Sequence, residues 1–338
     1  MYLILKERPR GKMRPLTSKG ENMTIDNIIE EIDKAKSIVI LTHEMPDGDA
    51  IGSSLALYAG LKQLGKDVDV IIPEYSKTFE FLPNSSEIKK EGRNQNYDLA
   101  IALDCGDIKR LNGFANYFED ANTKISIDHH SANTMFADYN FVNPTAPACA
   151  QILIIVLQAL GIEINREIGT CLLTGIITDT GGFKYSGVTA ETFEFAAELL
   201  NSGVNVSSIY KKVLQTLSKP SFELRRIAMN RLEFLEQGKI AFTYITKKDE
   251  EELQAGNNDH EGIVEMGRDI EGVEISIFLR ETDNGYKISL RSNEYVNVSD
   301  ICLMFSGGGH IRAAGGSINL PFEQAREKLI EECKKHLR

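Results

Sequence analysis

Apolar and polar positions alternate along the first two-thirds of the chain in a pattern that predicts strands interleaved with helices. Short apolar runs rich in β-branched residues predict strands at 37–43, 66–73, 97–107 and 124–128. Apolar residues at helical spacing predict helices at 24–35, 50–65, 149–161, 166–177 and 189–203. Strands that alternate with helices are typical of an α/β fold with a parallel sheet covered on both faces. In such sheets, ligand-binding residues gather in loops after the carboxyl ends of the strands.

The pattern changes after residue 205. Residues 206–237 have helical spacing with a break at Ser218-Lys219-Pro220, and we interpret them as a helical linker. Strands follow at 239–246, 273–282, 286–293 and 314–320, with a hairpin turn at 282–285 and a closing helix over 321–338. The sequence therefore predicts an α/β domain at 23–205 and a smaller α/β domain at 238–338. Residues 1–22, which are basic and lack the apolar core of a signal peptide, are predicted to be a disordered extension.

Composition and charge narrow the class of protein. The chain has 338 residues, which suits two domains, and no apolar run approaches the roughly 20 residues that cross a bilayer, so we expect no membrane association. The five cysteines are scattered and form no C-x-x-C pair, which favours reduced thiols and a cytoplasmic location. A net charge of −11 argues against a protein that coats long duplex nucleic acid. This net charge is compatible with the binding of small phosphorylated ligands.

Four of the six histidines lie in loops rich in acidic residues or glycine: His43, His129, His130 and His310. The segment "HEMPD", beginning at His43, nearly spells the H-E-x-x-H zinc motif of helical proteases. However, Pro46 is disfavoured inside a helix by about 3 kcal/mol, and the fifth residue is Asp47. We therefore interpret the segment as a strand-end loop that presents His43, Asp47 and Asp49. Asp49 also stands where a helix N-cap is expected, a role that contributes about 1 kcal/mol.

Further carboxylates and histidines end other predicted elements. Asp104 ends a buried strand, where an unpaired carboxylate is costly, so it is expected to face a cation. The next strand ends in Asp128, His129 and His130, and Asp179 follows an apolar helical run. This nitrogen and oxygen donor set without thiolates suits manganese, or a similar first-row ion, better than structural zinc. These ligands are more numerous than one ion requires, whereas two ions that share a bridging carboxylate would use all of them. Two-metal sites of this kind are suited to the hydrolysis of phosphate esters.

The segment 306–317, "SGGGHIRAAGGS", predicts an anion-binding loop. Its glycines leave backbone N–H groups accessible to an anion, and a neighbouring histidine and arginine add charge. The residues concerned are Gly307, Gly308, Gly309, His310 and Arg312. Arg291, on a predicted strand nearby, can bind phosphate oxygens in a bidentate manner. We favour it over Arg280, because Glu281 can pair with that arginine.

Taken in order, "HEMPDGDAIGS", "ALDCGD", "IDHH" and "TGIITDTGGF" resemble the four motifs of the DHH phosphoesterase superfamily, and "GGGHIRAAGG" resembles the signature of its associated C-terminal substrate-binding domain. The resemblance covers residues 24–338. Within the superfamily, the chain is similar to the bacterial nanoRNase/pAp phosphatase group. That similarity implies hydrolysis of short single-stranded RNA oligonucleotides to mononucleotides, and removal of a phosphate from 3′-phosphoadenosine 5′-phosphate (pAp).

The resemblance also implies roles for individual residues. One divalent ion would be held by His43, Asp47 and Asp104. A second ion would be held by Asp49, Asp104, His129 and Asp179, so that Asp104 bridges the two ions. His130 would face the scissile phosphate, and Asp128 would orient the histidines. The substrate would be gripped from the second domain by Gly307, Gly308, Gly309, His310, Arg291 and Arg312.

Several alternatives stay open at the level of sequence. A linear or cyclic dinucleotide phosphodiesterase is the first, followed by a RecJ-like single-strand exonuclease. A catalytically silent nucleotide-binding regulator is disfavoured because the ligand set is complete. A homodimer is compatible with the sequence, which does not determine the oligomeric state.

Overall fold

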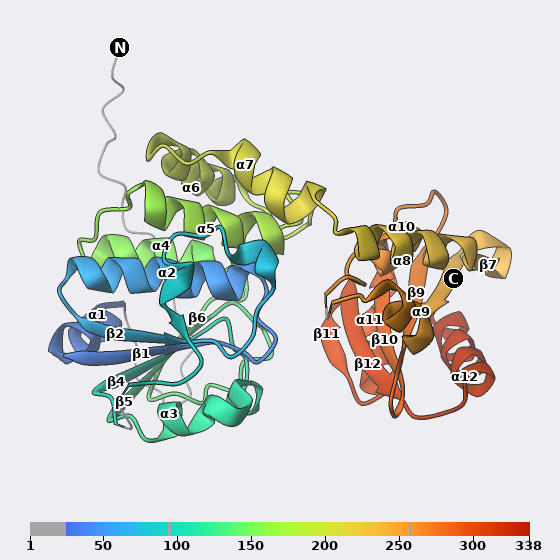
Figure 1. Cartoon of the computed structure of the whole chain (residues 1–338), viewed down its shortest axis with the longest axis horizontal. Coiled ribbons are helices and arrows are strands. Elements are labelled where there is room, and N and C mark those ends of the chain that lie inside the picture. The colour runs from blue at the N-terminus through green and yellow to red at the C-terminus, as the bar shows by residue number, and fades with distance from the viewer. Residues whose placement is uncertain (1–24, 94–95, 257) are drawn as a thin grey trace, which may run out of the picture. The chain divides into compact units, whose positions relative to one another are not determined.

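The structure is a computed structural model that describes residues 25–93, 96–256 and 258–338 (Figure 1). The chain divides into two compact units, the first ending at Thr216 and the second beginning at Leu217. This division falls inside the segment that we interpreted as a linker. The extension predicted at residues 1–22 lies outside the described residues. None of the helices among the described residues has both the length and the apolar character that crossing a bilayer requires.

The first unit is built on a six-stranded sheet in the order β3-β2-β1-β4-β5-β6, and every pairing between its described strands is parallel. The strands are β1 (Ser37–Leu41), β2 (Asp67–Ile71), β3 (Ile88–Lys89), β4 (Leu99–Leu103), β5 (Thr123–Asp128) and β6 (Tyr139–Val142). The four central strands agree with the prediction. The two edge strands, β3 and β6, were not predicted, because they are too short or too polar to form an apolar run.

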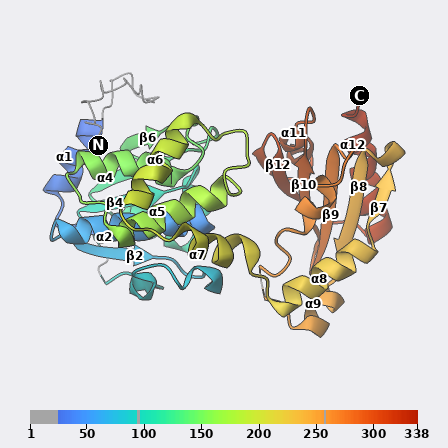
Figure 2. The same ribbon diagram turned by 90° about the horizontal axis from the view of Figure 1, so that it is seen from above.

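Helices cover both faces of this sheet, as the alternating pattern predicted (Figures 1 and 2). One core lies between the sheet and α1, α2, α4 and α5, while α3 packs on the opposite face through a second, smaller core. The helices of the unit are α1 (Ile25–Lys34), α2 (Gly48–Gln63), α3 (Ala115–Glu119), α4 (Cys149–Ala159), α5 (Arg166–Asp179), α6 (Ala190–Asn201) and α7 (Val206–Tyr210).

The expectation that Asp49 caps its own helix is wrong. Helix α2 begins earlier, at Gly48, and its N-cap is Asp47, whose Oδ1 accepts from the backbone N–H groups of Asp49 (3.0 Å) and Ala50 (3.1 Å). Asp49 instead caps α4, because its carboxylate accepts from the N–H groups of Cys149 (2.6 Å) and Ala150 (2.9 Å). This fully buried carboxylate therefore joins the starts of two helices.

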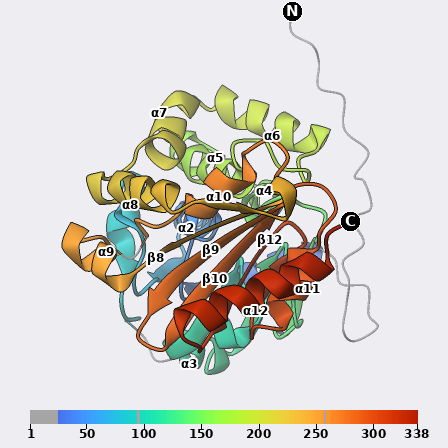
Figure 3. The same cartoon turned by 90° about the vertical axis from the view of Figure 1, so that its right-hand side faces the viewer.

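The second unit has a six-stranded sheet in the order β11-β12-β10-β9-β8-β7, in which β8 and β9 are parallel and the other pairs antiparallel (Figure 3). The strands are β7 (Glu233–Leu235), β8 (Ile240–Ile245), β9 (Ile275–Thr282), β10 (Gly285–Ser292), β11 (Gly308–His310) and β12 (Ala313–Ile318). The helices are α8 (Lys219–Asn230), α9 (Lys247–Leu253), α10 (Ile263–Arg268), α11 (Val298–Leu303) and α12 (Phe322–Lys335). Helices α11 and α12 contribute to one core of the unit, and α8 and α10 contribute to another.

The hairpin predicted at 282–285 connects β9 to β10. The segment interpreted as an all-helical linker is only partly helical. It forms α7, a π-helical turn at Lys211–Gln215 and α8, but its end contains β7, which pairs with β8.

Asp69 in β2 is a buried carboxylate held by four donors. Its oxygens accept from Lys89 Nζ (2.6 Å), Arg93 Nε (2.7 Å), the Arg93 backbone N–H (3.0 Å) and Tyr97 Oη (2.6 Å). Burial raises the pKa of Asp69, but these donors outweigh it and lower the pKa to about 2. A lowered carboxyl pKa stabilises the fold above the ordinary value of about 3.9, and the stabilisation is lost as the pH falls through the folded-state pKa.

We therefore expect Asp69→Asn to lower the free energy of unfolding at pH 7 by about 3 kcal/mol, because it removes the charge of a fully buried carboxylate that accepts four hydrogen bonds, two of them from cationic side chains. Urea denaturation measures this loss, and the difference from the wild type should shrink as the pH approaches 2. Asp67→Asn is the matched control. Asp67 pairs with the same Arg93 (2.6 Å), but its side chain is 54% exposed, so its loss should cost no more than about 1 kcal/mol. Equal losses in the two variants would contradict the account.

Candidate active site

The candidate ligands meet where β1, β4 and β5 end. These strands are neighbours in a parallel sheet, so their carboxyl ends lie at one edge. The loop after β1 brings His43 and Asp47, β4 is followed by Asp104, and β5 leads into His129. Helices α2 and α5 add Asp49 and Asp179, the latter as the last residue of its helix. The structure thus brings together side chains that are up to 136 residues apart in the chain.

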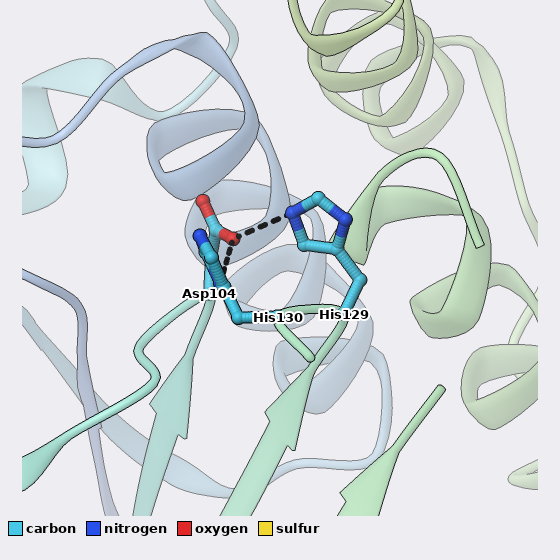
Figure 4. Close-up of side chains that lie close together, drawn as sticks. All are labelled: Asp104, His129 and His130. Atoms are coloured by element: carbon cyan, nitrogen blue, oxygen red, sulfur yellow. Dashed lines mark ion pairs between the residues drawn. The ribbon is translucent and has the colours of Figure 1, made fainter. Parts of the chain in front are cut away.

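Asp104 lies at the centre of this cluster and is almost fully buried. Its backbone adopts a left-handed conformation (φ +52°), which aspartate tolerates better than most residues, while its N–H continues the ladder to Ile127 O (3.1 Å). Oδ1 lies 3.3 Å from His129 Nε2 and 3.6 Å from His130 Nδ1 (Figure 4), and Oδ2 lies 3.9 Å from His43 Nε2. Burial raises the pKa of Asp104, but His129, His130 and His43 outweigh it and hold the pKa well below its usual range.

The hydrogen bonds of His129 define its tautomer. Nδ1 lies 3.2 Å from the carbonyl oxygen of Ala146, which can only accept, so Nδ1 carries a proton. Nε2 then meets two carboxylate oxygens, Asp104 Oδ1 at 3.3 Å and Asp179 Oδ2 at 3.2 Å. This arrangement requires a proton or a metal ion at Nε2. Burial lowers the pKa of His129, but the hydrogen bond and charge of Asp104 outweigh it and raise the pKa well above its ordinary value.

Asp128 and His130 form a pair beside Asp104. Asp128 is fully buried, and its Oδ1 lies 2.7 Å from His130 Nδ1 and accepts from the His129 N–H at 2.8 Å. Its other oxygen accepts from Asn133 Nδ2 at 2.7 Å. Burial lowers the pKa of His130, but Asp128 and Asp104 outweigh it and raise that pKa. Asp128 therefore fixes both the turn after β5 and the orientation of the His130 ring.

The donor set fits divalent cations. Ligand atoms of His43, Asp47 and Asp104 lie within 4.8 Å of one another, as do those of Asp49, His129 and Asp179. Ligand atoms of Asp104, His129 and His130 also lie within 4.8 Å of one another, so Asp104 belongs to the first set and lies next to His129 of the second.

Two observations support this fit. Among the described residues, the buried atom His43 Nδ1 has no hydrogen-bond partner, and the neighbours of the buried Asp104 Oδ1 are histidine nitrogens at 3.3 and 3.6 Å. In addition, burial and the charge of Asp104 raise the pKa of Asp49 to about 7. Crowded carboxylates of this kind are stabilised by a cation.

One contact of this site was not indicated by the sequence pattern. The segment Ile108–Phe114, which follows β4, folds against the loop of His43. The Glu44 N–H donates to Arg110 O at 2.8 Å, and Asn112 Nδ2 donates to the Glu44 carboxylate. The sequence offered one signal for this contact, which is Arg110 six residues after the strand-end Asp104.

In the second unit, Gly308–His310 form the edge strand β11 rather than the predicted open loop. The glycines allow a close approach to β12. A Cβ at Gly307 would lie 2.0 Å from Gly315 O, and Gly309 has φ +147° with Ala313 O only 2.6 Å from a Cβ position. Gly308 differs from both, because a Cβ there would meet no atom within 4 Å.

Strand register places Arg291 and His310 on one face of the second sheet. Arg291 is opposite Ala313 on β12, and Ala313 is opposite His310 on β11, so all three side chains share a face. Arg291 Nε donates to Glu265 at 2.9 Å and Nη1 donates to Leu290 O at 3.0 Å. Its Nη2 has no hydrogen-bond partner among the described residues.

Arg312 contacts the backbone of a neighbouring loop. Nη1 donates to Val296 O at 2.8 Å, and Nη2 donates to Glu294 O. Buried Glu274 holds the same loop by accepting from three consecutive N–H groups of residues 294–296. Arg280 pairs with Glu250 at 2.8 Å, not with the expected Glu281.

Comparisons with known proteins find similarity in both units of the chain. Residues 37–176 match the N-terminal domain of the DHH family, and residues 237–338 match the DHHA1 domain. The bifunctional oligoribonuclease and PAP phosphatase NrnA of Thermus thermophilus is 34% identical, with 92% of this chain and 94% of that protein covered. An exopolyphosphatase-related protein from Bacteroides fragilis has a crystal structure with a TM-score of 0.86 and 30% identity, covering 92% of this chain and 95% of that one. Crystalline exonuclease RecJ bound to manganese shares the fold at 14% identity, with a TM-score of 0.53 and coverage of 93% and 94%.

Proposed function

The chain belongs to the DHH family of phosphoesterases, and from this premise we propose that it hydrolyses short oligoribonucleotides to mononucleotides and removes a phosphate from pAp. It is a hydrolase of phosphate esters. The two activities are those named for the 34% identical Thermus relative. A long duplex does not fit the acidic net charge of −11.

The observation that carries the proposal is the ligand cluster around Asp104. Its side chains form three overlapping groups, within each of which the imidazole nitrogens and carboxylate oxygens lie within 4.8 Å of one another, and no cysteine among the described residues belongs to them. We assign His43, Asp47 and Asp104 to one ion. We assign Asp49, His129 and Asp179 to the other ion, with Asp104 as the ligand that bridges the two. Oxygen and nitrogen donors of this kind suit manganese. Two such ions, when bound, would supply a hydroxide near neutral pH and neutralise charge on the phosphate.

The side chains around this cluster have distinct tasks in the proposed reaction. His129 presents Nε2 to the cluster because Ala146 holds its Nδ1 proton. His130 is oriented by Asp128 through Nδ1, which directs its other ring nitrogen toward the substrate. The raised pKa of His130 favours its protonated form, which can donate a proton or a hydrogen bond to the leaving oxygen.

The second unit is proposed to bind the remainder of the substrate. His310 and Arg291 lie in one row on one sheet face, and Nη2 of Arg291 is a donor suited to a phosphate oxygen. The three glycines expose the backbone at the same edge strand. Arg312 orders the adjoining loop and adds positive charge beside it.

Gly308→Ala tests the role of the glycine strand. Its Cβ meets no atom of the protein, so the melting temperature should be unchanged. If substrate approaches the backbone there, KM for a diribonucleotide should rise by about 10-fold to 100-fold, because small displacements of a substrate are costly. Gly309→Ala is the contrasting variant: its φ of +147° predicts a loss of stability as well. Unchanged kinetics in Gly308→Ala would remove this strand from the binding site.

The proposed function is tested by product analysis with manganese on four substrates side by side: pAp, linear diadenylate, a five-residue RNA and a cyclic dinucleotide. We expect AMP from the first two and mononucleotides from the RNA, with little cleavage of the cyclic compound. Preferred cleavage of the cyclic dinucleotide would favour the dinucleotide phosphodiesterase alternative. A long single strand assayed in parallel tests the other alternative, because its degradation faster than that of the five-residue RNA would favour a RecJ-like exonuclease.

We also propose a cytoplasmic location, which is supported by five buried cysteines without a disulfide among them. A homodimer stays a prediction that measurement of the solution mass will test.

A further inference from the structure

Two loops of the first unit are joined beside the ligand cluster. The loop after β1 carries His43 and Glu44, and the segment Ile108–Phe114 follows the β4 carboxylate Asp104. The Glu44 N–H donates to Arg110 O, and the Glu44 carboxylate accepts from Asn112 Nδ2. Asp107 caps the segment by accepting from the Lys109 N–H at 2.8 Å. The backbone of Arg110 is therefore fixed to the residue that follows His43.

Asn112 shows that this arrangement is imposed by the contact. Its backbone conformation (φ +46°, ψ −126°) lies outside the helical region, although its neighbours are helical. Such conformations cost about 1–3 kcal/mol and persist where surrounding contacts hold them. Here the holding contact is the hydrogen bond to Glu44, whose side chain no other step of the proposed mechanism uses.

Arg110 is a cation without a counter-ion next to an acidic site. Its side chain is exposed, and no carboxylate lies within ion-pair distance of it among the residues that the structure describes. The carboxylate of Asp47 is engaged at the N-terminus of α2. The backbone oxygen of Arg110 lies 2.8 Å from the backbone nitrogen of Glu44, the residue that follows His43. The long side chain of Arg110 therefore starts next to the loop that carries the first ligand of the cluster.

We propose that Arg110 binds a non-bridging oxygen of the phosphate that is hydrolysed at the ligand cluster, and that Glu44 positions the segment that carries it. This inference rests on the proposed function. Divalent ions at the cluster would repel a neighbouring guanidinium. A phosphate bound between the ions and the guanidinium would be attracted to both, because it carries the opposite charge. A guanidinium presents paired N–H donors that match phosphate oxygens.

The test compares Arg110→Ala and Arg110→Lys with Lys109→Ala, which removes the same charge from the adjacent exposed residue. With saturating manganese, Arg110→Ala should lower kcat/KM for pAp and diadenylate by about 100-fold, as loss of one donor to a developing charge does elsewhere. Arg110→Lys should recover part of this loss, since it keeps the charge but not the paired donors. Lys109→Ala should stay within twofold of the wild type.

Two binding measurements separate a phosphate contact from a structural role. Calorimetric titration with manganese alone should give Arg110→Ala an affinity equal to or higher than that of the wild type, because a repelling cation has been removed. Titration of the manganese-loaded protein with inorganic phosphate should show weaker binding in this variant. Phosphate affinity equal to that of the wild type, or manganese affinity reduced as much as turnover, would overturn the proposal. Inactivity of the wild type would count against the proposed function instead, while the phosphate titration would still test Arg110.

The positioning role of Glu44 is read from a double-mutant cycle. Glu44→Ala should lower kcat/KM by about tenfold but add nothing to Arg110→Ala, because both act through one guanidinium. Glu44→Gln retains an acceptor for Asn112 and should restore most of the activity. Additive losses, or failure of glutamine to restore activity, would show that Glu44 does not act through Arg110.

Discussion

Asp104→Asn is expected to lower hydrolysis of pAp and diadenylate by about 10³-fold or more. Asp104 is the carboxylate that lies 3.3–3.9 Å from His129, His130 and His43, and we assign it to both ions. Asparagine keeps the size of the side chain and tolerates the left-handed backbone at φ +52°, where alanine would be strained. The variant therefore removes a charge without disturbing the turn after β4, and a large loss of metal-assisted catalysis follows.

Stability measurements provide the control for this variant. Without metal, Asp104→Asn should remain folded but have a lower free energy of unfolding than the wild type at pH 7, because the pKa of Asp104 is held below its usual range and its ionised form therefore stabilises the fold. Turnover close to the wild-type rate at saturating manganese would eliminate Asp104 as a shared ligand. Loss of activity together with unfolding would move the role of Asp104 from metal binding to structure.

His130→Ala is expected to lower kcat by about 10²–10⁴-fold, the usual contribution of a positioned proton donor. Its effect on manganese affinity should be small, because we assign His130 to the phosphate and not to an ion. The wild-type kcat should fall at high pH as His130 loses its proton, at a pH above the ordinary histidine value because its pKa is raised. This alkaline decrease should be absent in the variant.

The distinction between a proton donor and a ligand is testable in the same experiment, since His130 also groups with Asp104 and His129 within 4.8 Å. Manganese affinity that falls in parallel with kcat would make His130 a ligand. An unchanged alkaline decrease in the variant would assign that titration to another group.

The strand-end residues could be predicted because their positions follow from the chain's simplest regularities. Buried parallel strands form continuous apolar runs, and polar residues that end neighbouring runs meet at one edge of the sheet. This is why Asp104 and His129 could be placed together from sequence. The edge strands β3 and β6 lack such runs, so the pattern did not reveal them.

Other features depend on contacts that no local pattern encodes. Asp49 caps α4, 100 residues away, and not its own helix. The glycines at 307–309 have the composition of a loop, but Gly308–His310 form an edge strand, because the absence of a Cβ at Gly307 and Gly309 permits the close approach of the backbones. The contact between Glu44 and Asn112 likewise joins segments that are far apart in the sequence. It depends on a non-helical backbone conformation of Asn112, which the residue type alone does not predict.

The central claim, that two ions at the Asp104 cluster perform phosphoester hydrolysis, is tested most directly by manganese titration of the metal-free protein, with calorimetry and diadenylate hydrolysis followed on the same samples. The account predicts two bound ions per chain and activity that rises mainly with the second. In Asp104→Asn, at least one of the two should bind more weakly by about tenfold or more. Full activity with a single ion per chain, or hydrolysis that persists after chelation, would contradict the account.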